Sequence, residues 1–468
     1  MHPLDRLAHL DGVAQAQLVQ RGELTALDLL DACERRLKLV DPLLHSVVTS
    51  DFEAARRRAA RGVSGPFAGV PFLFKDVCPY PGLRCSFGAR LFSRNVPEQG
   101  SPFTERADAA GLLTVGKSAT SELGMIGSTE TLLEGVTHNP WGLTLSASGS
   151  SGGAAAAVAA GIVPLAHASD GGGSLRGPAA SAGVFGLKPS RGRTVPSSLT
   201  PSPYDSLLSD GCISRSVRDT ALFLSLVEAE GPLPRLGYVG EPGPGALRIG
   251  YHSTTLLGSE PESECLRALE SSVALCRELG HLVEPAAAPR VDGRALSAAY
   301  FAFAGSALVA MVELLEPMLG RALGSEDLEP FTLQLIAAAR VHGVDVRGCF
   351  EAATRAYLDA LAPYDVLLTP TYATCPWQLG WLSPLLPRDE LIARTEQAVC
   401  YTPVHNIAGC PAMSVPLHWS AGGLPIGSHF AAAPGREALL LGLAYQLEQA
   451  RPWADHWPPY SFPRIARA

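Results

Sequence analysis

A stretch rich in glycine, serine and alanine, residues 145–193, constrains this chain more than any other. Its small residues gather in two short turns, at 149–153 and 171–174, and both turns combine glycine with serine. Glycine lets the backbone approach a ligand closely, so a serine in such a turn can be presented as a nucleophile. Between the turns, the alanine-rich run 154–160 predicts a helix, and 162–168 predicts a short buried strand.

The second turn offers consecutive backbone N–H groups that no bulky side chain covers. Such a nest can bind the oxyanion that forms during acyl transfer. The residues of this predicted oxyanion hole are Gly171, Gly172, Gly173 and Ser174. We predict Ser174 as the nucleophile. Asp170 and Arg176 flank the turn, and as an ion pair they would hold its shape.

The residues around both turns also resemble a known pattern. The motifs that carry the resemblance are Gly149-Ser-Ser-Gly-Gly, Asp170-Gly-Gly-Gly-Ser-Leu-Arg, Gly186-Leu-Lys-Pro-Ser and Thr402-Pro-Val-His-Asn-Ile-Ala-Gly-Cys-Pro-Ala-Met-Ser-Val-Pro. Their order and spacing resemble the amidase signature family, whose members are hydrolases with a Ser-Ser-Lys triad. The resemblance runs from near residue 10 to Trp453. It is closest to the branch that contains 6-aminohexanoate cyclic dimer hydrolase.

The resemblance implies a role for three residues of this chain. Ser174 would form the acyl-enzyme, Ser150 would be a bridging serine held by a cis peptide, and Lys75 would be the base. The expected reaction is hydrolysis of a linear or cyclic carboxamide. Neutral Lys75 would accept the proton of Ser150, and Ser150 that of Ser174. The resemblance also implies that the region 246–365 shapes the acyl pocket, where Phe301, Phe303 or Met311 could meet the substrate.

The use of lysine supports a special role for Lys75 independently of the resemblance. Four lysines, Lys38, Lys75, Lys117 and Lys188, leave arginine to supply 33 of the 37 basic residues. Arginine cannot lose its proton near neutral pH, so a retained lysine is a candidate for proton transfer. Lys75 follows an apolar stretch at 70–74, and burial disfavours an ammonium group.

The energetic cost of a neutral lysine is within reach of a folded protein. Neutralising a lysine of ordinary pKa at pH 7.4 costs about 4 kcal/mol, and burial shifts lysine pKa values by up to roughly 3–5 units. Taken alone, however, Lys75 can also be read as an ion-pair partner of the neighbouring Asp76. The base and the ion pair therefore both stay open at this point.

Three other functions compete with the amidase prediction. Gly149-Ser-Ser-Gly-Gly also satisfies Gly-x-Ser-x-Gly, which would make Ser151 the nucleophile of an α/β-hydrolase esterase. The segment from Gly111 to Ser118 formally matches a phosphate-binding loop, although its apolar interior favours a strand. The third is an amidotransferase A-type subunit, which would work with partner subunits and RNA.

Composition limits the classes of partner. The chain has 468 residues, 47% hydrophobic and 18% charged, with a formal charge of −8 and no basic cluster. We therefore expect a small-molecule amide substrate and no nucleic-acid or membrane partner, and we leave a homodimer open. The 10 cysteines show no metal-ligand spacing, so we expect no metal, no cofactor and a cytoplasmic protein with reduced thiols.

The predicted fold class is α/β, with a mixed twisted sheet sandwiched between helices in a single amidase-signature domain. We expect a helical N-terminal segment at 1–60, followed by a catalytic domain at 61–468. Within the catalytic domain we expect a core at 61–230, the pocket-shaping helices at 246–365 and a return to the core at 366–468.

Overall fold

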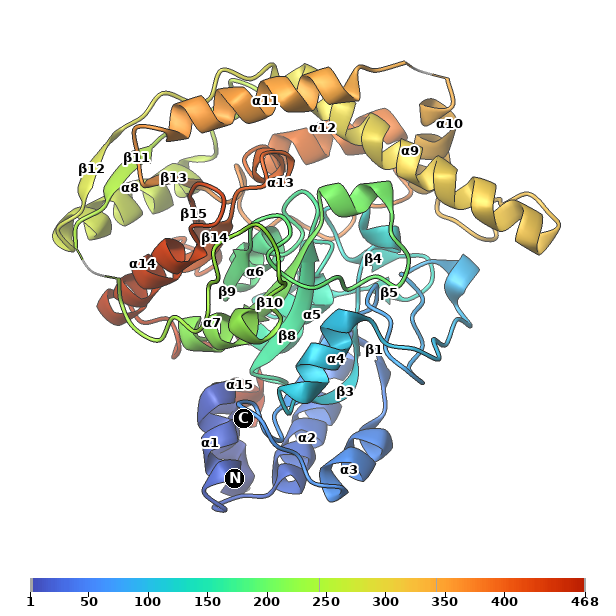
Figure 1. Cartoon of the computed structure of the whole chain (residues 1–468), viewed down its shortest axis with the longest axis vertical. Coiled ribbons are helices and arrows are strands. Elements are labelled where there is room, and N and C mark those ends of the chain that lie inside the picture. The colour runs from blue at the N-terminus through green and yellow to red at the C-terminus, as the bar shows by residue number, and fades with distance from the viewer. Residues whose placement is uncertain (1–2, 244, 342, 467–468) are drawn as a thin grey trace.

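A mixed sheet of eleven strands forms the centre of the protein, in a computed structural model that describes residues 3–243, 245–341 and 343–466. The strand order across this sheet is β1-β3-β2-β8-β10-β9-β14-β15-β13-β11-β12. Helices lie on both faces of the sheet, as Figure 1 shows. The predicted α/β class, with one mixed sheet between helices, is confirmed.

The strands of the central sheet, in chain order, are β1 (Val47–Ser50), β2 (Pro71–Lys75), β3 (Leu113–Ser118), β8 (Leu165–Asp170), β9 (Phe185–Lys188), β10 (Ser209–Ser214), β11 (Arg248–Tyr251), β12 (Leu282–Pro285), β13 (Val366–Pro370), β14 (Ala412–Trp419) and β15 (Pro425–Ala431). Two small sheets pair β4 (Glu130–Thr131) with β5 (Gly135–Val136) and β6 (His138–Asn139) with β7 (Gly142–Ser146).

The α-helices are α1 (Gly12–Gln20), α2 (Ala26–Leu44), α3 (Phe52–Ala60), α4 (Pro102–Ala109), α5 (Gly152–Ala159), α6 (Arg176–Ala182), α7 (Val217–Leu226), α8 (Ser263–Glu278), α9 (Gly293–Leu319), α10 (Pro330–Ala339), α11 (Val346–Leu361), α12 (Arg388–Ala398), α13 (Pro403–Ile407), α14 (Glu437–Ala450) and α15 (Phe462–Ile465).

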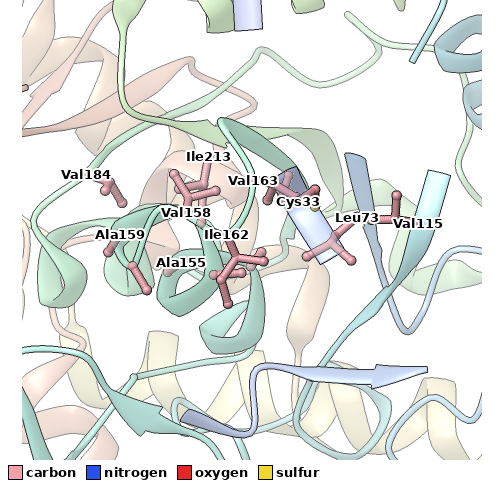
Figure 2. Close-up of a cluster of buried hydrophobic side chains, with 14 of the residues drawn as sticks. Cys33, Leu73, Val115, Ala155, Val158, Ala159, Ile162, Val163, Val184 and Ile213 are labelled. Carbon is pink, nitrogen blue, oxygen red and sulfur yellow. The ribbon is translucent and has the colours of Figure 1, made fainter. Parts of the chain in front are cut away.

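Alternation along β2 separates two parts of the core. Leu73 belongs to a cluster with α2, α3, α5 and α6, which Figure 2 shows in close-up. Phe72 and Phe74 point to the opposite face, because successive strand residues do so, and they pack with α1, α4 and α7. Lys75, at the end of this buried strand, therefore lies between the two helical layers.

Helix α9 is the longest helix and covers the end of the sheet that carries the site. It packs against α10 and α11 at the top of the view in Figure 1. By length and composition alone, α9 could cross a membrane, although only 39% of its most apolar window is buried. Helix α9 also lines both cavities described below.

The N-terminal segment is not purely helical, in contrast to the prediction for 1–60. Residues Val47–Ser50 form the strand β1, which pairs with the edge of β3. Helix α2 continues through Pro42 to Leu44. Thr25 caps this helix through reciprocal hydrogen bonds with Asp28.

Candidate active site

Two cavities meet at Ser174. This residue lies in the turn between β8, which ends at Asp170, and α6, which begins at Arg176. A larger cleft of about 800 Å³ is lined by Ser150, Ser174 and the segment 197–205. A smaller cavity of about 100 Å³ is lined by Ser174 and by residues of α9 and α12. Ser174 is thus accessible from both sides.

Lys75 contacts two serines in a buried site. Its Nζ lies 2.7 Å from Ser150 Oγ and 2.9 Å from Ser169 Oγ. Lys75 and Ser150 are both 1% exposed. The peptide bond between Gly149 and Ser150 is cis. The structure therefore brings together Lys75 and Ser150, which the sequence analysis singled out, and adds Ser169, to which that analysis gave no role.

Burial makes the neutral form of Lys75 accessible near pH 7. Burial lowers the pKa of its amine to about 7, although the negative charges of Asp210 and Asp170 act in the opposite direction. A group with a pKa near the ambient pH is suited to proton transfer, because both protonation states are populated.

Asp76 does not pair with Lys75. Its Oδ1 lies 3.4 Å from Nζ of Lys117 on the neighbouring strand β3, and its other oxygen accepts hydrogen bonds from Ser86. Lys117 also donates to the Cys78 carbonyl at 2.6 Å. The ion-pair interpretation of Lys75 is therefore wrong, and the negative charge beside it in the sequence is neutralised by another lysine.

A histidine and an aspartate hold the backbone of Lys75. The Lys75 N–H donates to His167 Nδ1 at 3.3 Å, and His167 Nε2 lies 3.0 Å from Asp210 Oδ1. Since Nδ1 accepts, Nε2 carries the proton and donates it to Asp210. Ser197 donates to the second oxygen of Asp210 at 2.7 Å. Burial lowers the pKa of His167, and this effect is larger than the opposing effect of Asp210. The neutral form of the imidazole ring is therefore favoured.

Three backbone N–H groups of the glycine turn are available to a ligand. Within the described part of the chain, no acceptor is hydrogen-bonded to the N–H of Gly171, Gly172 or Ser174. The N–H of Gly173, by contrast, donates to Asp170 Oδ1 at 2.7 Å. Gly173 has φ +130°, and a side chain there would collide with Thr402, so only glycine fits.

Asp170 and Arg176 form the predicted ion pair under this turn. Arg176 Nε and Nη2 each lie 2.9 Å from a different oxygen of Asp170, and neither side chain is exposed. Burial opposes the Asp170 charge, but Arg176 outweighs it and holds the carboxyl pKa well below its usual range. Such a bidentate pair fixes the orientation of the turn.

The C-terminal segment braces the same turn from the other side. Asn406 Nδ2 donates to the Asp170 carbonyl at 2.7 Å, and its Oδ1 accepts from Arg176 at 2.7 Å. Thr402 donates to the Gly172 carbonyl at 2.7 Å, and the Tyr300 hydroxyl donates to the Gly171 carbonyl at 3.1 Å. The sequence analysis quoted Thr402 and Asn406 only as parts of a motif, and their roles depend on contacts between distant segments.

The competing motifs lie in unsuitable places. Ser151 is fully buried, and its hydroxyl donates to the Ser169 carbonyl at 3.2 Å. In the segment from Gly111 to Ser118, Gly116 and Lys117 lie inside strand β3, and Lys117 is also buried. A phosphate-binding loop follows its strand and leaves its backbone open, so this match does not form one.

Two of the three side chains suggested as substrate contacts line a cavity. Phe301 lines the smaller cavity, and Met311 lines the larger cleft. Phe303 instead stacks on Tyr204 with ring centroids 6.1 Å apart. Helix α9 therefore lines both cavities, the smaller one with its N-terminal part and the larger one with its C-terminal half.

The α/β fold and a cleft that combines a buried lysine, two serines and free backbone N–H groups are consistent with a hydrolase. A family model described as Amidase matches residues 28–441. The protein AmiC of Mycobacterium leprae is 37% identical over 96% of this chain and 97% of that protein. The 6-aminohexanoate-cyclic-dimer hydrolase of Paenarthrobacter ureafaciens is 34% identical over 96% of both chains.

Solved structures agree with this assignment. A structure of 6-aminohexanoate cyclic dimer hydrolase superposes with a TM-score of 0.89 at 32% identity, covering 97% of this chain and 99% of the other. The chain belongs to the amidase family. It is a hydrolase that acts on amides, as the sequence predicted.

Proposed function

We propose that the protein hydrolyses carboxamides through an acyl-enzyme on Ser174, with Ser150 and Lys75 as its proton relay. The observation that carries the proposal is the 2.7 Å contact between Lys75 Nζ and Ser150 Oγ. The lone pair of the neutral amine accepts the Ser150 proton, while an amine N–H donates to Ser169 Oγ at 2.9 Å.

The first half of the reaction forms an ester. Ser174 Oγ bonds to the amide carbonyl carbon as its proton passes to Ser150 and the Ser150 proton to Lys75. The carbonyl oxygen becomes an oxyanion, which the free N–H groups of Gly171, Gly172 and Ser174 stabilise. Gly173 contributes its conformation instead, because its N–H binds Asp170. The C–N bond then breaks, and the amine leaves with a proton returned by Ser150.

The second half regenerates the enzyme. Water adds to the Ser174 ester and gives a proton to the same relay, and the carboxylic acid leaves as Ser174 recovers its proton. No hydrogen bond joins the two serine hydroxyls among the described residues, so Ser174 has to rotate toward Ser150 on substrate binding. Catalytic hydrogen bonds are often made only in the substrate complex.

A fluorophosphonate probe tests the nucleophile. Trypsin leaves Ser150, Ser151 and Ser174 on one peptide, because no lysine or arginine lies between Lys117 and Arg176. Cleavage before Asp170 separates Ser174 from the other two. We expect the adduct on the Ser174 fragment and none with Ser174→Ala. An adduct on Ser151 would instead support the esterase alternative.

The substrate panel should contain linear and cyclic amides, because the named relative acts on a cyclic dimer. We also propose a cytoplasmic location and a reaction without metal or cofactor. Free cysteines throughout the described residues support the location. Activity that EDTA abolishes and zinc restores would contradict metal independence.

A further inference from the structure

The smaller cavity combines an apolar wall with one acidic side chain. Residues of two helices form much of the wall, including Leu296 and Phe301 of α9 and Glu396 of α12. At its inner end the cavity reaches Gly172 and Ser174. A substrate group bound in this cavity is therefore directly next to the carbonyl that reacts with Ser174.

Glu396 is a carboxylate without a cation. It is half-buried, and among the described residues no side chain or backbone group forms an ion pair or a hydrogen bond with it. The other acids of α12 are paired, since Asp389 contacts Arg388 at 2.6 Å and Glu390 contacts Arg394. A partly desolvated carboxylate in an apolar cavity is stabilised by a cation that enters with the ligand.

The charge of both cavities has the same sign. Neither is lined by a described lysine, arginine or histidine, whereas the larger cleft is lined by Glu98 and Asp205. Asp205 is used locally, because it accepts a hydrogen bond from the Ser202 N–H at 2.8 Å. The cavities therefore offer no positive charge to a negatively charged substrate group, but they offer carboxylates to a positively charged one.

The position of Ser150 indicates which half of the substrate enters the smaller cavity. Ser150 lines the larger cleft and is absent from the wall of the smaller cavity. Under the proposed function, Ser150 returns a proton to the leaving amine, so the amine departs through the larger cleft. The acyl group, which stays on Ser174, then extends into the smaller cavity.

We propose that the smaller cavity is an acyl subsite for aliphatic chains that end in an ammonium group, which pairs with Glu396. This inference rests on the proposed acyl-enzyme and names its substrate class, ω-amino acyl amides. The apolar wall accommodates the methylene groups, and Glu396 supplies the only charge among the described residues of the wall.

The test compares p-nitroanilides whose acyl chains end in ammonium, methyl or carboxylate, over a series of chain lengths. At the best length we expect kcat/KM for the ammonium chain to exceed that for the methyl chain at least about tenfold, equivalent to about 1.4 kcal/mol. Glu396→Gln should reduce this ratio to near one. The ratio is taken within each variant, so a general effect of the substitution on the enzyme cancels.

A charge-matched control is Asp389→Asn, on the same helix but with a side chain that is 88% exposed. This variant should keep the wild-type ratio, which excludes a general effect of net charge. A wild-type enzyme that hydrolyses the methyl and ammonium chains equally well would overturn the subsite but leave the proposed function intact. An unchanged ratio in Glu396→Gln would also overturn it. Failure to hydrolyse any of the anilides would count against both proposals.

Discussion

Lys75 is distinguished from the two other buried lysines by its contact with a serine. Lys117 and Lys188 are fully buried too, and burial lowers the pKa of Lys188 to about 7, as it does for Lys75. Lys188, however, donates to the Pro189 carbonyl at 2.7 Å. Three of the four lysines are thus buried, and only the fold shows which of them contacts a serine.

If Lys75 acts as a neutral base, arginine cannot replace it. Lys75→Arg and Lys75→Ala should both lower kcat/KM by about 10²–10⁴-fold, because arginine keeps the charge but not the ability to release a proton. Both variants should be measured on an amide substrate after circular dichroism has shown that they fold. Substantial activity in Lys75→Arg would remove Lys75 from the relay.

The pH dependence should report the same lysine. Because the pKa of Lys75 is lowered to about 7, the wild-type kcat/KM should rise with pH through about 7 and level off above it. The control variant Lys188→Met also removes a buried amine. Its kcat/KM should still rise with pH through about 7, as in the wild type. If the rise of kcat/KM with pH were lost in Lys188→Met and kept in Lys75→Arg, Lys188 and not Lys75 would be the base.

Strands β8 and β10 together determine how strongly Lys75 holds its proton. They pair antiparallel and bring Asp210 beside Ser169, close to the lysine amine. Since the Asp210 charge raises the pKa of Lys75, Asp210→Asn should lower that pKa. The acid limb of kcat/KM should then move to lower pH by about one unit.

A matched control separates this charge effect from a loss of structure. Ser197→Ala removes the 2.7 Å hydrogen bond to Asp210 but leaves its charge, so the limb should stay near its wild-type pH. Asparagine is nearly isosteric with aspartate, and its Oδ1 can still accept the hydrogen bond from His167 Nε2–H. A limb that does not move in Asp210→Asn would show that this carboxylate does not influence the base.

Helix α13 supports the glycine turn at 171–174 through the buried side-chain amide of Asn406. Asn406→Ala removes hydrogen bonds to Asp170, to Arg176 and to the Leu207 carbonyl. We expect a loss of about 1–3 kcal/mol in the free energy of unfolding, measured by denaturant titration, because buried partners are left unsatisfied. We also expect a lower kcat, because the turn loses its orientation.

Asn139→Ala provides the comparison for Asn406. Asn139 is also buried, and its amide donates to the Ser146 and Ser181 carbonyls at 3.1 and 2.9 Å, away from the turn. This variant should lose similar stability but keep its kcat when measured below its unfolding temperature. Equal effects on kcat in both variants would show that Asn406 acts only through stability.

At the scale of the whole molecule, local patterns predicted elements but not their order in the sheet. Spacing and hydrophobicity predicted the glycine turns, the helix at 154–160 and the buried strand at 162–168, which correspond to the region of α5 and β8. The insertion of β14 and β15 between β9 and β13 could not, because it depends on pairing across more than 200 residues. For the same reason, the contacts of Asn406 and Tyr300 with the glycine turn could not be predicted from the sequence. The roles of Lys75 and Ser150 were predicted from the family resemblance.

The cysteines allow a test of the packing of the whole chain. Eight of the ten thiols are buried, while Cys349 and Cys375 are half-buried. Burial raises the pKa of the interior thiols, for instance to about 11 for Cys33, so few of them form the reactive thiolate. Hydrogen bonding from Cys265 lowers the pKa of Cys375, which should make it the fastest to react.

We therefore expect an aromatic disulfide reagent at pH 8 to label two thiols rapidly in the folded protein and all ten in denaturant. A Cys349→Ser, Cys375→Ser double variant should show no rapid phase. Cys400 lines the smaller cavity, yet it is 5% exposed and burial raises its pKa to about 12, so it should react slowly. Rapid labelling of three or more thiols in the folded wild type would contradict the packing of the core, because the additional sulfurs would have to be reachable from solvent.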